Sequence, residues 1–419
     1  MTGRKLIITE LALGDRRIRL SGLTEDGRLL EARAEPLKEQ DSGAKKEETG
    51  RIGDGWKADR SLLGNIYVGR VQRIVPNLHA AFIEIAPGKA CYYPISEKEA
   101  PVFVKKIPSP RLVQGDELLV QVKKEAVKTK APVVTANLNL SGRYAVVTAN
   151  DHRVGVSGKL TREKQEHFKA LIRQFFGGQL SCGVIIRTNA GEIPDEDVLA
   201  EVGRLKAALS DLIQKAAART CFSCVYQANP RYLSYLQDVY QEGLSEILTD
   251  LPEVYAKVEE YRRDYPALLS VPLRLYADPL LPLANLYNLH RQLERALQKN
   301  VWLKSGGYLV IEPTEALTVI DVNTGKSMDQ KNPQKHFLKT NLEAADEIAA
   351  QIRLRNLSGI VIIDFIDLAS AADRETVMRR LRAAVKEDPV PVYVVDMTKL
   401  ELVEMTRKKI EKSLAEQLG

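Results

Sequence analysis

The pattern of apolar and polar positions divides the chain into segments of different character. Residues 1–35 alternate with a period of two in the runs KLIITELAL, RIRLSGL and RLLEARAE, which predicts three β-strands. Residues 36–60 are rich in charge and glycine and have little to bury, so they predict a loop or linker. Between Leu62 and Leu140, five short β-like runs predict a small closed barrel, most simply of the OB type.

The remaining segments combine strands with helices. Residues 143–215 mix strands with two helical patterns, and residues 230–300 predict mostly helix. The last part of the chain predicts, in order, the strands GYLVIEP and EALTVIDV, a helix over 340–357 ended by Gly359, the apolar strand GIVIIDFIDL, a helix from Ala371 to Lys386 and the strand VPVYVVD. This alternation predicts an α/β layer with parallel strands and right-handed crossovers.

The amino-acid composition excludes some classes of protein but does not point to one function. The 419 residues are 44% hydrophobic and 28% charged, as in an ordinary globular protein, and the length suggests roughly two to four domains. The net charge of +6 permits a polyanionic partner without requiring one. No apolar run has the length of a membrane helix and the N-terminus lacks a signal-peptide core, so we expect a cytoplasmic protein without a membrane partner.

The cysteines do not form a recognisable framework. Four cysteines in so long a chain do not predict a disulfide scaffold. Cys221 and Cys224 form a single CxxC pair, which supplies at most half of a tetrahedral zinc site. Their segment, TCFSCVYQ, is apolar and extended, so we interpret the two thiols as buried small side chains rather than metal ligands.

Two aspartates end neighbouring strands of the predicted α/β layer. Alternation in ALTVIDVN places Asp321 and Asn323 on one side of their strand, and Asp364 ends the next strand, one crossover later. Ligand sites of open α/β sheets lie beyond the carboxyl ends of strands, so we expect Asp321 and Asp364 to converge. Such a pair suits Mg²⁺, which binds through one or two acids and keeps water for chemistry. The alternative is that each aspartate caps a turn or helix, and for Asp367 we favour an N-cap.

Three long blocks resemble the catalytic core of the ribonuclease E/G family. They are SGGYLVIEPTEALTVIDVNTG, TNLEAADEIAAQIRLRNLSGIVIIDFIDL and LVEMTRKK, and the resemblance covers nearly the whole chain. It implies that Asp321 and Asp364 hold a catalytic Mg²⁺ and that Asn323 helps to position the attack. The implied reaction is hydrolysis of single-stranded RNA, in RNA processing or decay, that leaves a 5′-phosphate and a 3′-hydroxyl.

The resemblance also implies an α/β multidomain architecture. An OB-type barrel and a sensor subdomain would be inserted in an RNase H-like subdomain, followed by a DNase I-like α/β catalytic subdomain. The implied divisions are residues 1–60 (first part of the RNase H-like subdomain), 61–142 (OB-fold RNA-binding domain), 143–229 (5′-sensor subdomain), 230–297 (second part of the RNase H-like subdomain) and 298–419 (catalytic subdomain).

In the barrel, the resemblance assigns RNA contacts to three residues. Phe82 and Tyr92 match base-stacking positions, and Lys130 matches a lysine that faces the phosphates. Aromatic platforms beside a basic groove are the usual way to hold a single strand. Phe82 lies between Ala81 and Ile83, so it could instead belong to the barrel core.

The segment VIIRTNAG resembles the family's element for binding a substrate's 5′-monophosphate. Arg187 and Thr188 would then be the phosphate ligands, because a guanidinium fork and a hydroxyl suit phosphate oxygens. The segment GVS, with Val156 at its centre, matches a neighbouring sensor element more weakly. Without the family pattern, an arginine at a strand end is usually only solvated.

Two other classes of protein compete with this interpretation. A non-catalytic RNA-binding or ribosome-associated protein of the same fold would be expected to have lost an acid of the metal site, and both are present. A DNA nuclease or phosphoesterase could use the same metal chemistry, but the barrel and the sensor segment favour RNA.

The family's catalytic domain normally continues into a CPxC zinc link between two subunits, and this sequence stops before it, at Gly419. We therefore expect no structural zinc and, at most, a weakened homo-oligomer.

Overall fold

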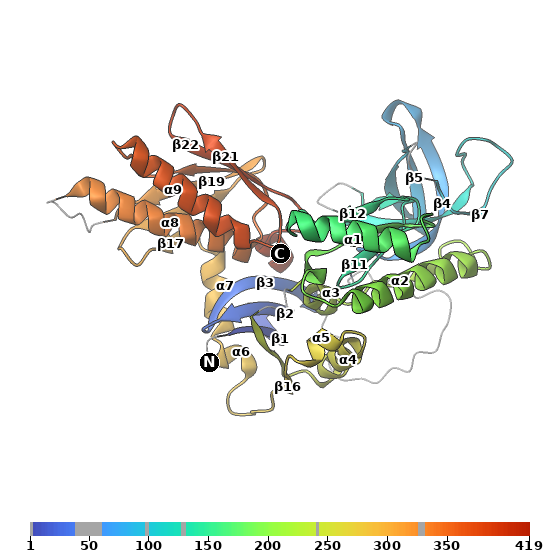
Figure 1. Ribbon diagram of the computed structural model, residues 1–419, viewed down its shortest axis with the longest axis horizontal. Helices are drawn as coiled ribbons and strands as arrows, with labels where there is room; N and C mark the ends of the chain where they lie inside the picture. Colours follow the sequence, from blue (N-terminus) through green and yellow to red (C-terminus); the bar gives the residue numbers. More distant parts are fainter. Residues whose placement is uncertain (1–2, 38–60, 97–99, 127–130, 240–242, 326–331) are drawn as a thin grey trace. The chain divides into compact units, whose positions relative to one another are not determined.

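The computed structural model describes the chain except for residues 1–2, 38–60, 97–99, 127–130, 240–242 and 326–331. Nearly all of the predicted loop 36–60 and Lys130 therefore lie outside the described residues. The chain divides into two compact units (Figure 1). The first contains residues 1–41, 242–264 and 269–419, and the second contains residues 42–241 and 265–268.

In the first unit, a five-stranded sheet joins segments that are far apart in sequence. Its order is β16-β15-β1-β2-β3, antiparallel among β1, β2 and β3 and parallel from β1 through β15 to β16. The strands are β1 (Arg4–Leu13), β2 (Arg16–Glu25), β3 (Arg28–Leu37), β15 (Leu244–Thr249) and β16 (Leu273–Leu275). The three N-terminal strands are as predicted. The sheet thus pairs residues 4–37 with residues 244–275.

The region predicted as mostly helical, residues 230–300, has more helix than strand, but it also contains two short strands that were not predicted. It contains β15 and β16 as well as α3 (Arg231–Asp238), α4 (Pro252–Arg263), α5 (Pro266–Leu269), α6 (Leu283–Leu286) and α7 (Leu289–Leu297). The two strands are short, and short apolar runs do not distinguish strand from helix by their period. Leu289 and Leu293 of α7 pack with Leu20 and Leu29 of the sheet in one core.

The second unit contains the predicted barrel. Strands pair in the ring β4-β5-β6-β9-β8, and pairing of β4 with β8 closes it, as in an OB-type barrel. These strands are β4 (Ile66–Val75), β5 (Ala80–Ala86), β6 (Lys89–Pro94), β8 (Glu117–Lys124) and β9 (Val133–Thr135), with β7 (Phe103–Lys105) and β14 (Cys224–Tyr226) added at its edges. Val71, Ile83, Tyr93 and Val120 help to fill the interior.

A four-stranded sheet follows the barrel in the same unit. Its order is β10-β11-β13-β12, and the elements are β10 (Asn139–Ser141), β11 (Ala145–Thr148), β12 (Val154–Val156), β13 (Gly183–Ile186), α1 (Arg162–Phe175) and α2 (Asp195–Ala216). Glu201 of α2 is 1% exposed, and its carboxylate accepts the backbone N–H groups of Arg143, Tyr144 and Ala145 at 2.6–2.9 Å. A Cβ at Gly142 would lie 2.2 Å from this carboxylate, so glycine is required there.

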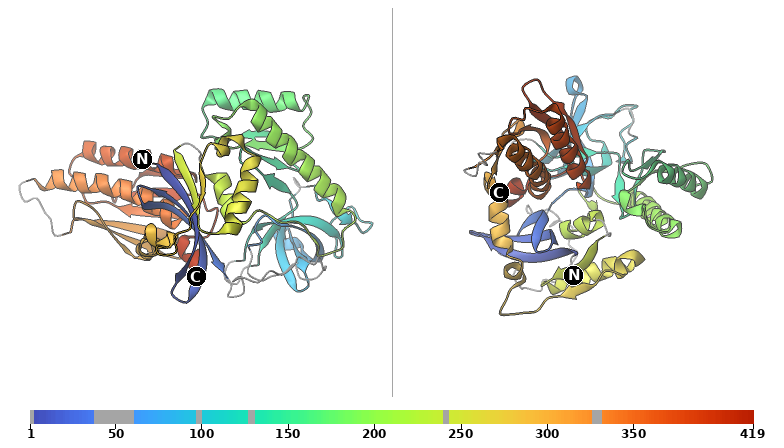
Figure 2. Two further views of the ribbon diagram at one scale, coloured as in Figure 1. Left: turned by 90° about the horizontal axis from the view of Figure 1, so that it is seen from below. Right: turned by 60° about the vertical axis from the view of Figure 1, so that its left-hand side comes forward.

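The last part of the first unit is a six-stranded sheet with helices on one face. Its order is β17-β18-β19-β20-β22-β21. The elements are β17 (Asn300–Trp302), β18 (Tyr308–Pro313), β19 (Leu317–Asn323), α8 (Pro333–Arg355), β20 (Gly359–Asp364), α9 (Ala371–Ala384), β21 (Val392–Met397), β22 (Leu402–Arg407) and α10 (Leu414–Leu418). Helices α8 and α9 lie side by side on the sheet (Figure 2), and Ile320, Ile348 and Leu381 share its core.

Two predictions for this layer were wrong in detail. β19 and β20 are parallel as predicted, but β21 is not the next parallel strand, because β22 lies between β20 and β21 and is antiparallel to both. A tight turn joins β21 to β22, and antiparallel strands need no long crossover. The helix α8 ends with Asn356 in the left-handed conformation (φ 49°), and Gly359 instead begins β20.

We predict that Glu201→Ala destabilises the second unit by about 3 kcal/mol or more, since it leaves three buried N–H groups without their acceptor. The midpoint of urea unfolding measures the effect. The control is Asp211→Ala, which removes only an exposed i,i+4 ion pair with Lys215 on the same helix and is expected to cost less than about 1 kcal/mol. Equal effects of the two substitutions would contradict the structural role of Glu201.

Candidate active site

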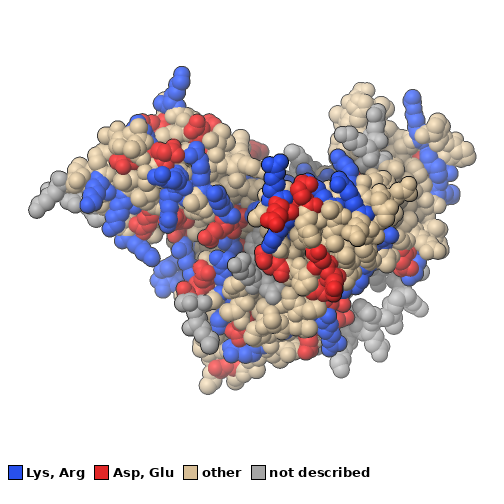
Figure 3. All heavy atoms as spheres, in the orientation of Figure 1, with Lys and Arg blue, Asp and Glu red and all other residues tan. Residues whose placement is uncertain are grey.

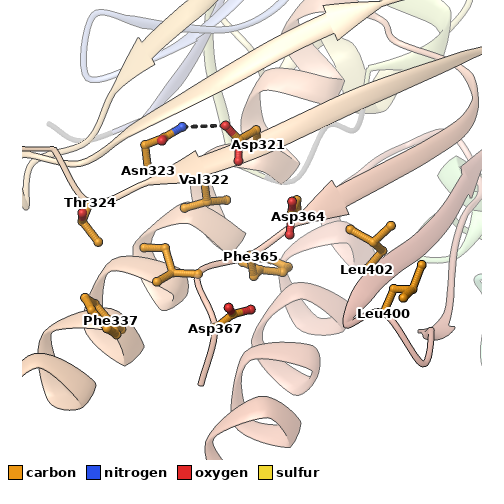
Figure 4. Close-up of a pocket in the computed structure, with 11 residues that line it drawn as sticks. Asp321, Val322, Asn323, Thr324, Phe337, Asp364, Phe365, Asp367, Leu400 and Leu402 are labelled. Atoms are coloured by element: carbon orange, nitrogen blue, oxygen red, sulfur yellow. Dashed lines mark hydrogen bonds between the residues drawn. The ribbon is translucent and has the colours of Figure 1, made fainter. Parts of the chain in front are cut away.

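The structure brings Asp321 and Asp364 together at the carboxyl ends of two strands. β19 and β20 are parallel, and these residues are direct partners in the register. Burial alternates along β19, so Ile320 and Val322 face the core while Asp321 and Asn323 lie on the opposite, less buried side. Asp364 is exposed at the end of β20. The convergence expected from the strand pattern is therefore present (Figure 4).

Hydrogen bonding and charge act on the two acids differently. The Asn323 side-chain amide donates to Asp321 Oδ2 at 2.7 Å and so orients that carboxylate (Figure 4). Partial burial raises the pKa of Asp364 above its ordinary value, and the neighbouring carboxylates of Asp321 and Asp367 raise it further. Like charges held this close disfavour ionisation unless a cation offsets them.

The acids open into a cleft of about 660 Å³. Its lining residues are Asp321, Val322, Asn323, Thr324, Phe337, Asp364, Phe365, Ile366, Asp367, Leu400 and Leu402. Asp367 is not the N-cap that we predicted, because α9 is capped by Ser370, whose hydroxyl accepts the Asp373 backbone N–H at 3.3 Å. Two residues separate Asp367 from the cap, and its side chain is exposed at the cleft instead.

The donor set of the cleft fits a hard divalent cation. Carboxylate and amide oxygens from Asp321, Asp364 and Asn323 are the ligand type that Mg²⁺ prefers, and this ion needs only one or two protein carboxylates. Within the described part of the chain, no three His, Cys, Asp or Glu side chains converge as ligands of one metal. A cation held by this pair would therefore keep positions for water and phosphate.

Phe82 and Tyr92 are paired on the outside of the barrel. They are direct partners on β5 and β6, and their rings meet edge to face with centroids 6.1 Å apart. The Arg73 guanidinium lies 4.4 Å from the Phe82 ring centroid. Phe82 is half-buried and is not a member of the barrel core, which Ala81 and Ile83 on either side of it belong to. The alternative that Phe82 is a core residue is thus excluded.

The predicted sensor residues lie together at the ends of two strands. Val156 pairs with Ile186 in the parallel strands β12 and β13, and Arg187 and Thr188 follow Ile186 in the chain. The Thr188 and Ser157 hydroxyls are 2.8 Å apart. Sequence reasoning did not single out Ser157, because only the parallel pairing brings it beside Thr188.

Arg187 is already engaged by protein groups. Its guanidinium donates to the Gly142 carbonyl at 2.8 Å and forms an ion pair with Asp238 at the end of α3. Asp238 was not predicted, since it is distant in sequence and only the packing of α3 brings it to the site. The ion pair holds the arginine in one orientation at the strand end, which a freely solvated arginine would not have.

The CxxC pair differs from our expectation in one respect. Cys224 lies on the edge strand β14 and is exposed, and Cys221 is half-buried, so the two thiols are not both enclosed. The edge position explains this, because only β4 covers the strand from one side. Local burial nevertheless raises the pKa of both thiols, which disfavours the thiolate form that zinc binds.

The surface shown in Figure 3 carries interspersed basic and acidic side chains over α8, α9, α1 and α2. One such contact is the two-bond ion pair of Arg380 with Asp346, which links α9 to α8. Across the described residues, the helices all lack the combination of length and apolarity needed to cross a bilayer.

The chain is an α/β protein with an OB-type barrel, mixed sheets and an acid-lined cleft. Comparison with known proteins identifies its family. A model of the ribonuclease E/G family matches residues 139–410. Ribonuclease G of Salmonella typhimurium is 33% identical over 369 residues, which cover 85% of this chain and 75% of that protein. Ribonuclease G of Haemophilus influenzae is 34% identical, with 85% and 74% covered. Ribonuclease E of Nostoc sp. is 30% identical over 368 residues, with 85% and 52% covered.

The chain therefore belongs to the ribonuclease E/G family and, with it, to the endoribonucleases, which are hydrolases.

Proposed function

We propose that this endoribonuclease is Mg²⁺-dependent and cleaves single-stranded RNA at the Asp321–Asp364 pair, in RNA processing or decay, leaving 5′-phosphate and 3′-hydroxyl ends. The observation that carries the proposal is the register of β19 and β20, which sets the two carboxylates side by side in an open cleft. A phosphodiester entering this cleft would add a third negative charge. Productive binding therefore needs a cation between the acids and the phosphate.

Asp321 and Asp364 would hold the ion, and Asn323 would keep Asp321 oriented through its 2.7 Å bond. When bound, Mg²⁺ would supply charge neutralisation at the phosphate and an activated water. Asp367, exposed in the same cleft, would contribute negative potential that favours the ion. The exposed position of Asp364 leaves room for a phosphate beside it.

The barrel supports single-stranded RNA as the substrate. Phe82 and Tyr92 present ring surface outside the barrel core, and Arg73 adds positive charge beside Phe82. Unpaired bases stack on such rings, while bases within a duplex are not accessible to them. We propose Lys130 as a phosphate contact of the same surface from the family pattern alone, because it lies outside the described residues.

We further propose that Arg187, Thr188 and Val156 recognise a 5′-monophosphate. The neighbouring hydroxyls of Thr188 and Ser157 and the fork of Arg187 offer donors to phosphate oxygens. Asp238 would hold the guanidinium in place, and its negative charge would set how strongly a phosphate must compete for the arginine.

Asp321→Asn and Asp364→Asn are each expected to reduce cleavage of single-stranded RNA at least about a hundredfold, roughly 3 kcal/mol in the barrier. Each change removes a charged oxygen ligand and preserves shape, so RNA binding should be retained. Cleavage rates across a magnesium titration give the measurement. The control is Asp396→Asn, an exposed aspartate of β21 in the same sheet, which should remain active. Near-normal turnover of either variant at low magnesium would show that the catalytic site lies elsewhere.

Arg187→Ala is expected to erase any preference for 5′-monophosphorylated over 5′-hydroxyl RNA and to spare cleavage of the latter. The matched control is Arg153→Ala, which removes an exposed arginine paired with Asp151 near the same sheet. Rates on the two RNAs, differing only in the 5′ group, are compared for each variant. Equal slowing of Arg187→Ala on both RNAs would assign the residue a structural or general RNA-binding role.

A further inference from the structure

Leu400 is an exposed apolar side chain at the rim of the acid-lined cleft. It is 80% exposed and lies with Leu402 beside Asp364 (Figure 4). Leu402 is the direct register partner of Asp364 between β22 and β20, so the turn before β22 places Leu400 next to the acid pair. An exposed leucine contributes nothing to the core of the sheet, and a single one on a surface needs no explanation by itself. Leu400, however, lies in a closed turn with a strained backbone, and this position does need an explanation.

The turn that carries Leu400 is tightly bonded. The Glu401 backbone N–H donates to the Thr398 carbonyl at 3.0 Å, and the Thr398 N–H donates to the Leu402 carbonyl at 2.8 Å. The Thr398 hydroxyl accepts the N–H groups of Leu400 and Leu402 at 3.3 and 3.2 Å. These bonds close the turn on both sides of Leu400, whose side chain is exposed at the tip next to that of Lys399.

Glu401 occupies a conformation that usually selects glycine. Its φ is +60°, where the Cβ of an L-residue is crowded, and a turn of this kind commonly has glycine at the corresponding position. The Glu401 carboxylate lies 3.3 Å from Arg374 of α9, which also donates to the Leu368 carbonyl. The ion pair attaches the turn to α9. This attachment requires a glutamate at a position where its backbone is strained. Strain retained beside a cleft in this way is characteristic of functional sites.

We propose that Leu400 is a substrate-binding residue that packs against a nucleobase next to the scissile phosphate. The inference rests on the proposed function of the cleft. If the phosphate lies at Asp321 and Asp364, the base of an adjoining nucleotide is the nearest apolar surface that the substrate can bring to Leu400. Contact with the face of a base needs no hydrogen-bond partner, so an aliphatic side chain suffices, and Glu401 with Arg374 keeps it in position.

The test uses single-stranded RNA with one cleavage site and matched RNAs in which one nucleotide flanking that site is abasic. Leu400→Ala is expected to raise KM about three- to tenfold on intact RNA with kcat within about twofold, because loss of a partly buried aliphatic contact has an effect on this scale. An abasic nucleotide at the contacted position should slow the wild-type protein by a similar factor and leave Leu400→Ala unaffected. Leu400→Phe should restore tight binding of intact RNA.

Two further variants keep the inference falsifiable. Leu280→Ala, which truncates a leucine that is 93% exposed and lies outside the cleft, should leave KM unchanged. Glu401→Gly relieves the backbone strain but removes the ion pair that attaches the turn to α9. Because Leu400 is then no longer held in position, this substitution should raise KM as Leu400→Ala does. The inference is overturned if Leu400→Ala leaves KM unchanged, or if abasic RNA slows it as much as the wild-type protein. Those outcomes require active protein, whereas failure of the proposed function would appear as Asp321→Asn and Asp364→Asn variants that still cleave.

Discussion

The parallel register between β19 and β20 is the constraint on which the rest of the site depends. It sets Asp321 directly against Asp364, so two like charges meet at the end of a sheet whose opposite face is fully packed. Partial burial raises the pKa of Asp364, and the neighbouring carboxylates of Asp321 and Asp367 raise it further. A slip of one residue in either strand would turn one carboxylate into the core, so the packing of Ile320 and Ile363 against α8 and α9 also maintains the acid pair.

β22 and β21, which follow β20 in the order of the sheet, support this register from the side opposite β19. Arg407 of β22 is buried and donates to Asp388 at 2.8 and 3.1 Å and to the Asn356 side chain at 2.7 Å. These bonds join β22 to the end of α8 and to the chain that leads into β21. β22 is thereby held beside β20, and the turn with Leu400 is held at the rim of the cleft. A buried ion pair with these additional acceptors is well satisfied, as burial of a charge requires.

Much of the fold followed from the period of the sequence, and the errors have identifiable physical causes. The N-terminal strands, the closed barrel and the convergence of Asp321 with Asp364 all depend on alternation and crossover rules that act locally. β22 was missed although its burial alternates with a period of two, and its place between β20 and β21 depends on pairing that sequence spacing does not reveal. Asp367 was assigned to a cap because aspartate commonly caps a following helix, whereas Ser370, directly before α9, has that role. Leu400 and Asp238 gain their significance from a turn and from helix packing, neither of which sequence spacing reveals.

The central claim is that the paired carboxylates bind one divalent cation in the cleft. Mn²⁺ has the same preference for oxygen ligands and can be followed by electron paramagnetic resonance, so titrating the wild-type protein and the Asp321→Asn and Asp364→Asn variants tests it without RNA or turnover. The account predicts about one tight Mn²⁺ per chain that Mg²⁺ displaces and that either substitution weakens at least about tenfold. Unchanged Mn²⁺ binding in both variants would contradict it.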